Sequence, residues 1–309
     1  MDPDAIASVG TLLAEAERAD GHKPLSDQLW LDFVNGGVSG GRTGFVGVVA
    51  RDEGDVPIAY AQASRAHSSW TIELVVAPSH RGEQHAIGSD LIGAALDVIG
   101  AEGGGRVDWW VFEPTPEHDA LAAAIGLQPG RRLNQMRRPL PTDERPSIET
   151  RAFVPGVDED AWLDVNNRAF AEHREQGGWD RETLLLREHE PWFDPAGFLL
   201  HEADGRLAGF CWTKLHTDHD PPLGEIYVIA VDPDFHGRGL GKQLTLAGLD
   251  SIARRGVAVA MLYVDADNTA GVRLYDGLGF TVHRTDRAYV GDVPPIVDAT
   301  DRHSAVEVP

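Results

Sequence analysis

The chain has 309 residues with a hydrophobic content of 42%, which is enough for one large domain or two of ordinary size. Its formal net charge of −22 argues against nucleic acid or an anionic membrane as a partner, because both require a cationic surface. A single cysteine, Cys211, excludes a disulfide framework, and neither a signal-peptide pattern nor an apolar run of membrane-spanning length is present, so we expect a cytoplasmic protein.

The first half of the chain alternates helical patterns with β-branched runs. A helix is predicted over residues 8–19, and a longer one follows the polar loop that starts at Pro78. The predicted strands lie at residues 44–50, 57–64, 71–77 and 107–112. A short helix over residues 119–125 and a last strand complete this half.

The stretch "RRPLPTDERPSIETR", residues 137–151, is rich in proline and charge and has no periodicity, which is typical of a linker. After it the same order of patterns returns. Helices are predicted over residues 158–171 and 270–278, with a third after the loop that starts at Pro233. The predicted strands lie at residues 197–203, 206–214, 224–231 and 260–266, and a last strand follows.

The two halves are copies of one another. Pro78 corresponds to Pro233 and Gly126 to Gly279, and the register between these pairs changes only by an insertion in the first polar loop. We therefore predict an N-terminal domain at residues 1–140, a linker at 141–150 and a C-terminal domain at 151–309. The mixture of strands and helices predicts an α+β fold, with a mixed central β-sheet flanked by helices in each domain.

The loop "HGRGLGK", residues 236–242, follows a strand and precedes a helix. Such a loop exposes backbone N–H groups at a helix N-terminus, where they bind anions. It is not a Walker loop, because His236 stands where the first glycine is needed and Gln243 where Ser or Thr is needed. It is not a dinucleotide fingerprint either, because Lys242 occupies the third glycine position. A glycine-rich turn without any ligand is the alternative.

Two separate motifs resemble the GCN5-related N-acetyltransferase (GNAT) superfamily. The first is "VDPDFHGRGLGK", which departs from the usual pattern only in having His236 in place of Gln or Arg. The second is "YVDADNTAGVRLYDGLGF". The resemblance implies two tandem GNAT-like domains, with acetyl-CoA as the cosubstrate and its pyrophosphate in the glycine loop. No metal is expected.

The resemblance also implies which residues bind acetyl-CoA. In the second half they are Ile229, Ala230, Val231, His236, Gly237, Arg238, Gly239, Leu240, Gly241, Lys242, Asn268, Thr269, Ala270, Gly271, Val272 and Arg273. In the first half, where the loop is degraded, weak binding is expected from Leu74, Val75, Val76, Ile87, Gly88 and Ser89.

Acetyl transfer to an amine requires a group that takes the amine proton and benefits from an acid for the leaving thiolate. By resemblance to the superfamily, Glu225 is the predicted general base and Tyr275 the predicted general acid. A solvated charge at a strand start and a core aromatic residue are the respective alternatives. In the first half these positions hold Trp70 and Ala122, neither of which can transfer a proton, so we expect that half to be catalytically inactive.

Further segments resemble the mycothiol synthase family of actinobacteria, among them "VNNRAFAEHREQGGWD", "PWFDPAGFLL" and "CWTKLH". This resemblance implies acetylation of the cysteinyl amine of desacetylmycothiol, a small molecule. The implied substrate-binding residues are Asp27, Glu175, Lys214, Glu225 and Tyr263, although the family usually has Glu where Asp27 stands. For Glu175 and Lys214 an ordinary surface ion pair is the alternative.

Two other functions are compatible with these motifs. One is acetylation of a different amine, and the other is a non-catalytic module that senses acyl-CoA. A sensor would not require Glu225 and Tyr275 together. We expect the protein to act as a monomer.

Overall fold

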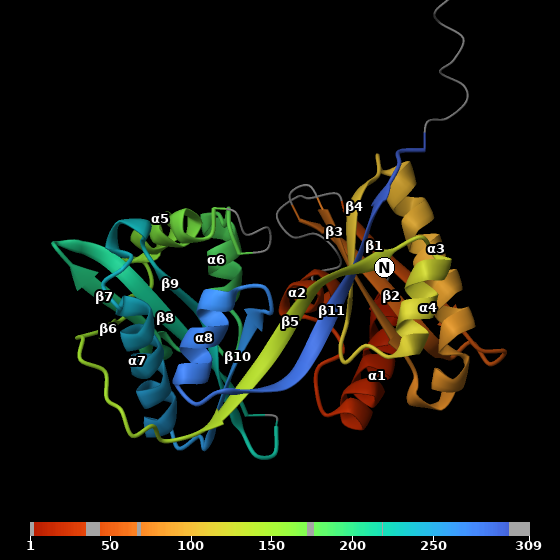
Figure 1. Ribbon diagram of the computed structural model, residues 1–309. Coiled ribbons are helices and arrows are strands. Elements are labelled where there is room, and N and C mark those ends of the chain that lie inside the picture. The colour runs from red at the N-terminus through yellow and green to blue at the C-terminus, as the bar shows by residue number, and fades with distance from the viewer. Residues whose placement is uncertain (1–2, 35–43, 67–68, 172–175, 218, 297–309) are drawn as a thin grey trace, which may run out of the picture. The chain divides into compact units, whose positions relative to one another are not determined.

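The computed structural model describes residues 3–34, 44–66, 69–171, 176–217 and 219–296 (Figure 1). The chain forms two compact units. Unit 1 consists of residues Met1–Arg132 and Asp286–Pro309, and unit 2 of Leu133–Thr285. Within the described ranges, no helix is long and apolar enough to cross a membrane.

Unit 1 contains a mixed sheet with the strand order β1-β2-β3-β4-β11. Its elements are α1 (Pro3–Asp20), α2 (Asp27–Val34), β1 (Phe45–Arg51), β2 (Pro57–Ala66), β3 (Ser69–Val76), α3 (Gln84–Ala101), β4 (Gly105–Val111), α4 (Pro116–Ala124) and the end of β11 (Thr281–Val293). Apolar residues of α3 and α4 form one core with the strands. Residues of α1 and α2 form another around Tyr60 and Val75. The sheet therefore has helices on both faces.

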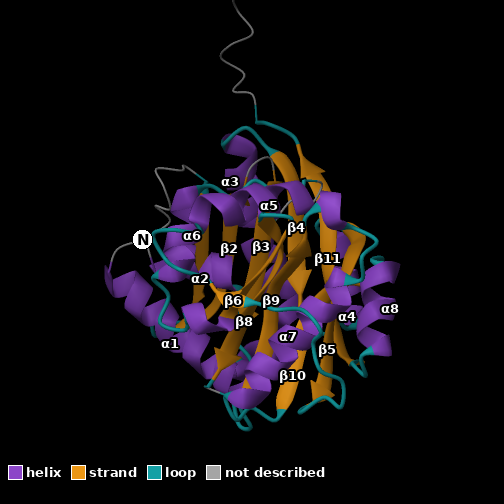
Figure 2. Ribbon diagram, turned by 90° about the vertical axis from the view of Figure 1, so that its left-hand side faces the viewer, coloured by secondary structure: helices purple, strands orange, loops and turns teal. Residues whose placement is uncertain are grey.

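In unit 2 the strand order is β5-β10-β9-β8-β7-β6. Its strands and helices are coloured orange and purple in Figure 2. Its elements are the end of β5 (Gln128–Pro139), β6 (Arg151–Ala152), α5 (Glu159–Ala169), α6 (Arg181–Glu188), β7 (Phe198–Ala203), β8 (Arg206–His216), β9 (Leu223–Val231), α7 (Leu240–Arg254), β10 (Val259–Asp265), α8 (Thr269–Gly277) and the start of β11. On one face, Leu244 and Ile252 of α7 pack with strand residues such as Ile226. On the other, Trp162 of α5 contacts the rings of Phe210 and Trp212.

The eight strands that were predicted with bounds are present within two residues of them, the last strand of each half is present as β5 and β11, and the α+β class is confirmed. Helices α2 and α6 were not predicted. Short amphipathic segments of eight residues carry little periodicity by which to recognise them.

Two strands contribute to both units. The part of β5 in unit 2 pairs antiparallel with β10, from Leu133 opposite Asp265 to Pro139 opposite Val259. The end of β11 pairs antiparallel with β4 in unit 1, from Arg287 opposite Val111 to Val293 opposite Gly105. Each sheet thus includes the last strand of the other sequence repeat, an arrangement that the repeat itself does not reveal.

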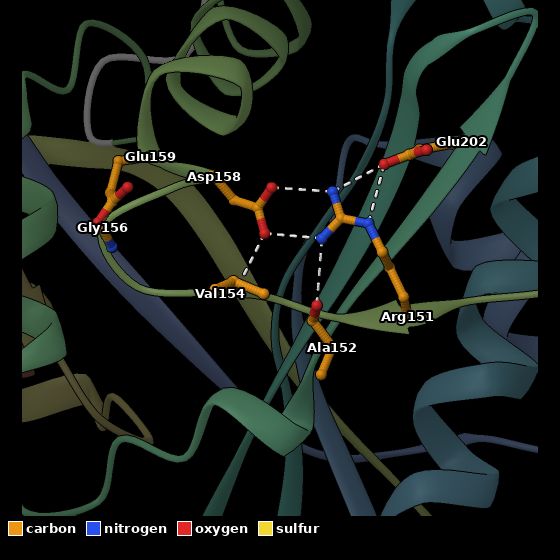
Figure 3. Close-up of polar contacts among 7 residues, drawn as sticks. All are labelled: Arg151, Ala152, Val154, Gly156, Asp158, Glu159 and Glu202. Carbon is orange, nitrogen blue, oxygen red and sulfur yellow. Dashed lines mark hydrogen bonds and ion pairs between the residues drawn. The ribbon is translucent and has the colours of Figure 1, made fainter.

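The short strand β6 is held by a cluster of charged groups (Figure 3). The guanidinium of Arg151 in β6 donates to Asp158 at 2.7 Å and to Glu202 of β7 at 2.7 Å. Asp158 also accepts the backbone N–H of Val154 at 2.8 Å. These hydrogen bonds from Arg151 hold the pKa of the Asp158 carboxyl below its ordinary value. The cluster joins β6, β7 and the start of α5, and residues 141–150 before it contain no helix or strand.

Candidate active site

Strands β9 and β10 part at the centre of unit 2. Their parallel pairing runs from Leu223 opposite Val259 to Ile226 opposite Leu262 and ends there, although β9 continues to Val231 and β10 to Asp265. Because the strands separate, the backbone groups of β9 beyond this point have no ladder partners from β10. A ligand with amide groups could pair with them.

A β-bulge places the polar residues of the site on one face of the sheet. Between β8 and β9 the register skips one residue, so that Trp212 lies opposite Val228 but Thr213 lies opposite Ile226. Lys214 then lies opposite Glu225. Because successive side chains of a strand alternate, Glu225 is on the face away from Ile226 and the α7 core. Without the bulge, Lys214 would lie opposite Ile226 instead.

Glu225 is buried, with 7% of its surface exposed, and lies one residue before the point where the strands part. Its Oε2 lies 2.7 Å from Nε2 of His216 at the end of β8. The sequence reasoning missed His216. The signal that could have found it is its spacing of two residues from Lys214 on one strand, which puts both on the same face.

Lys214 is also buried, at 3% exposure, and its ammonium lies against two aromatic rings. Nζ is 4.5 Å from the ring centroid of Trp192 and 5.3 Å from that of Tyr227. The negative faces of aromatic rings attract cations. These rings hold the ammonium beside Glu225, on the same face of the sheet. Neither Trp192 nor Tyr227 was predicted as a site residue.

Tyr263 of β10 is part of a polar network. Its hydroxyl accepts hydrogen bonds from Gln135 of β5 at 2.8 Å and from Arg284 of β11 at 3.2 Å. Gln135 in turn accepts from Arg137 at 2.8 Å. Burial, and next the neighbouring charge of Arg284, lower the pKa of Arg137. The face that carries Glu225 therefore has several hydrogen-bond donors that suit a hydroxyl-rich molecule.

The glycine loop begins where β9 ends. Gly237 has φ +77° and Gly239, the N-cap of α7, has φ +74°, a region that residues with a side chain rarely adopt. A β-carbon added at either position would meet nothing within 4 Å, so the surface of the loop is open. The first N–H groups of a helix lack partners within the helix and favour an anion. The loop thus has the geometry and the space for a phosphate group.

Three side chains of this loop contact residues outside it. His236, which replaces the usual Gln or Arg, donates from Nε2 to the carbonyl of Val231 at 3.1 Å. Arg238 pairs with Asp204 at 3.1 Å and Lys242 with Glu144 at 2.7 Å. His236 thus ties the loop to the end of β9 while leaving the glycine backbone exposed.

The helix α8 supplies Asn268 and Tyr275. Asn268 caps the helix, because its Oδ1 accepts the backbone N–H of Gly271 at 2.9 Å. Tyr275 is 9% exposed and packs edge-on against Phe280. Burial raises the pKa of Tyr275 to about 12, with a smaller contribution from Cys211. The phenol is therefore both a core aromatic group and a protonated donor at neutral pH.

The predicted substrate residues are distributed over the chain. Lys214, Glu225 and Tyr263 belong to one face of unit 2. Asp27 is the first residue of α2 in unit 1. Glu175 lies outside the described residues.

Unit 1 repeats the parted strands but has different residues at the positions that correspond to Glu225 and Tyr275. Its strands β3 and β4 separate after Ile72 and Trp109, and a cavity of about 260 Å³ opens there, lined in part by residues 74–76. The position of Glu225 is taken by Trp70, which is fully buried. Helix α3 begins at Gln84, so residues that correspond to the glycine loop are helical. Unit 1 therefore has a ligand-sized cavity without an open glycine loop.

Comparison with known proteins identifies the family. The model of the Acetyltransferase (GNAT) family matches residues 161–280, which include the glycine loop, Glu225 and Tyr275. A mycothiol acetyltransferase of Acidimicrobium ferrooxidans is 43% identical over 302 residues, covering 94% of each chain. The chain belongs to the mycothiol acetyltransferase family. A second relative of that name, from Thermobispora bispora, is 45% identical and covers 93% of this chain and 95% of its own.

As a mycothiol acetyltransferase family member, the protein is an N-acetyltransferase enzyme of the GNAT superfamily. Solved structures confirm the tandem fold. A tandem GNAT protein from the clavulanic acid biosynthesis pathway has a TM-score of 0.68 at 19% identity, covering 96% of this chain and 97% of its own. A GCN5-related N-acetyltransferase from Sphaerobacter thermophilus has a TM-score of 0.67 at 24% identity, with 96% of both chains covered.

Proposed function

We propose that unit 2 transfers the acetyl group of acetyl-CoA to the cysteinyl amine of desacetylmycothiol. The observation that carries this proposal is the position of Glu225. It is a buried carboxylate next to the point where β9 and β10 part, on the strand that leads into the open glycine loop. A proton acceptor and an anion-binding loop at the two ends of one strand are what a thioester-dependent transfer to an amine requires.

Each residue has a role in this proposal. The N–H groups of Gly237 through Lys242 bind the pyrophosphate, and the freed edge of β9 binds the amides of the pantetheine arm. Glu225 takes the proton of the substrate ammonium, so that the amine nitrogen can form a bond to the acetyl carbon. When the bond between the acetyl carbon and the sulfur breaks, Tyr275 gives its proton to the departing thiolate, and the second proton that the nitrogen loses on becoming an amide restores the phenol. Of the predicted set, Lys214 and Tyr263 of unit 2 bind polar groups of the acceptor.

We assign a secondary role to unit 1. The cavity between its parted strands supports the expected weak binding of acetyl-CoA by Leu74, Val75 and Val76, which line it. The other predicted residues, Ile87, Gly88 and Ser89, lie in α3 and are not among the residues that line this cavity. Trp70 and Ala122 leave that unit without a proton acceptor or donor at the corresponding positions.

The test is an assay of the purified protein with acetyl-CoA and a panel of amines, in which release of free coenzyme A is measured. The panel contains desacetylmycothiol, an aminoglycoside and a peptide with a free N-terminus. We expect release only with desacetylmycothiol. Equal rates across the panel would overturn the assignment of desacetylmycothiol as the substrate. Tight binding of acetyl-CoA without release of coenzyme A for any amine would favour the non-catalytic module that senses acyl-CoA.

A further inference from the structure

We infer that His216 is a positioning residue for the catalytic base: it holds one oxygen of Glu225 so that the other is left to accept the amine proton. The inference rests on the proposed function, since it requires that Glu225 acts as the base. It begins with the 2.7 Å contact between Nε2 of His216 and Oε2 of Glu225.

The direction of this hydrogen bond follows from the chemistry of the two groups. An ionised carboxylate can only accept hydrogen bonds, so the shared proton belongs to the imidazole ring and Nε2 is the donor. Among the described residues, the side-chain hydrogen bond of Glu225 is made by Oε2, and Oε1 is left without a partner. A base needs one such oxygen for the incoming proton.

The pair is well shielded from water. Its side chains are 13% exposed for His216 and 9% for Glu225. A hydrogen bond to a charged acceptor is stronger when little water competes for it. The bond therefore limits the rotation of a side chain that would otherwise have several rotamers.

The strand register brings the two residues together. His216 lies opposite Leu223, two residues before Glu225 on the same face, so that the two form a diagonal pair across β8 and β9. The charged and titratable groups that the described residues place nearby are Lys214, directly opposite Glu225, and His219, whose ring centroid is 5.7 Å from that of His216. On the other side, β10 places the uncharged Met261 opposite Glu225.

The variant His216→Ala removes the donor. We expect kcat/KM for the amine to fall about 10- to 100-fold, which is less than for removal of the base itself, while the Kd for acetyl-CoA is unchanged. A carboxylate that loses a hydrogen-bond donor binds a proton more readily. The variant should therefore need a higher pH than wild type to reach half of its maximal kcat/KM.

The variant His216→Gln supplies an amide N–H in place of the ring and should restore a large part of the rate. In the Glu225→Gln background, His216→Ala should cause little further loss, because the two residues act on the same step. His201→Ala is the matched control. His201 lies on β7, where its ring contacts the carbonyl of Glu149 at 2.8 Å, and we expect wild-type kinetics from it.

Three outcomes decide the matter. A wild-type rate and pH profile for His216→Ala would overturn the inference and leave the proposed function intact. A second outcome is a loss of rate that is the same at every pH, is not rescued by His216→Gln and adds to the loss in Glu225→Gln. His216 would then have only a structural role, and the inference would be overturned as well. Wild-type protein that is inert with every amine would overturn the proposed function and the inference together.

Discussion

Gly241 and Gly88 hold the same position near the start of α7 and α3, but only Gly241 has room for a side chain. A β-carbon on Gly241 would meet Leu274 at 3.7 Å, an ordinary contact. On Gly88 it would lie 2.8 Å from Leu121 and 2.9 Å from Leu74, closer than side chains tolerate. Substitutions at the two positions therefore have different consequences.

For Gly241→Val we expect acetyl-CoA binding to weaken about 10- to 100-fold, the effect of losing one charge-assisted hydrogen bond. The added side chain would block approach to the N–H groups at the start of α7, while the helix itself tolerates valine better than glycine. Calorimetry measures the Kd and thermal unfolding checks the fold. Gly241 is a better probe than Gly239, whose positive φ would strain any side chain.

Gly88→Val should instead destabilise unit 1, by roughly 1 to 3 kcal/mol, as overpacked cores do. Gly93→Val is the matched control in α3, since a β-carbon there meets nothing within 4 Å.

For the first of these variants, Gly241→Val, an unchanged affinity for acetyl-CoA would contradict the assignment of the glycine loop as the pyrophosphate site.

Glu225→Gln should lower kcat/KM for the amine by about 10² to 10⁴-fold near neutral pH, the usual contribution of a general base. The amide oxygen can still accept the hydrogen bond from His216, so the fold should be kept. The loss should shrink as the pH rises, because a growing fraction of the amine is then already neutral. Single-turnover rates across pH measure this. The half-exposed Glu202, changed to Gln, serves as the control, and a wild-type pH profile for Glu225→Gln would mean that the base lies elsewhere.

Tyr275→Phe should reduce kcat by roughly tenfold to a hundredfold, because a thiolate is a fairly good leaving group and needs less help from an acid. Burial raises the pKa of Tyr275 to about 12, so the phenol stays protonated through the neutral and mildly alkaline range. We therefore expect the ratio of wild-type to variant rates to be constant from about pH 6 to 10. An alkaline decline in the wild type below pH 10 that disappears in the variant would argue against this reading.

Trp192→Leu should raise the KM for the amine about 2- to 30-fold, which corresponds to the roughly 0.5 to 2 kcal/mol of a cation–π contact. The substitution removes the nearer of the two rings that hold the Lys214 ammonium in place. Trp192→Phe keeps a ring face and should lose less. Steady-state kinetics with both substrates decide the outcome. If the KM for acetyl-CoA rises instead, Trp192 acts on the cofactor side of the site.

Local patterns in the sequence were sufficient to predict much of the secondary structure of this molecule. The strands follow from runs of β-branched residues, and the repeat follows from residues that recur at a constant spacing. The turn before α7 could be predicted because its conformation requires positive φ values at Gly237 and Gly239, and glycine is the residue that adopts them most readily. That the loop binds an anion stays a prediction. Glu225 was proposed as the base by resemblance to the superfamily, from its position on the strand before that loop, and this role stays a prediction.

Tertiary structure decided the remainder, because pairing and packing depend on residues that are distant in sequence. The bulge at Tyr227 sets Lys214 opposite Glu225, and the same register brings His216 within hydrogen-bond distance of Glu225. The exchange of the last strands could not be predicted from the sequence. The alternation of side chains along a strand shows which face is buried, but it does not show which neighbouring strand it pairs with. The crowding around Gly88 likewise exists only once α3, α4 and β3 are packed together.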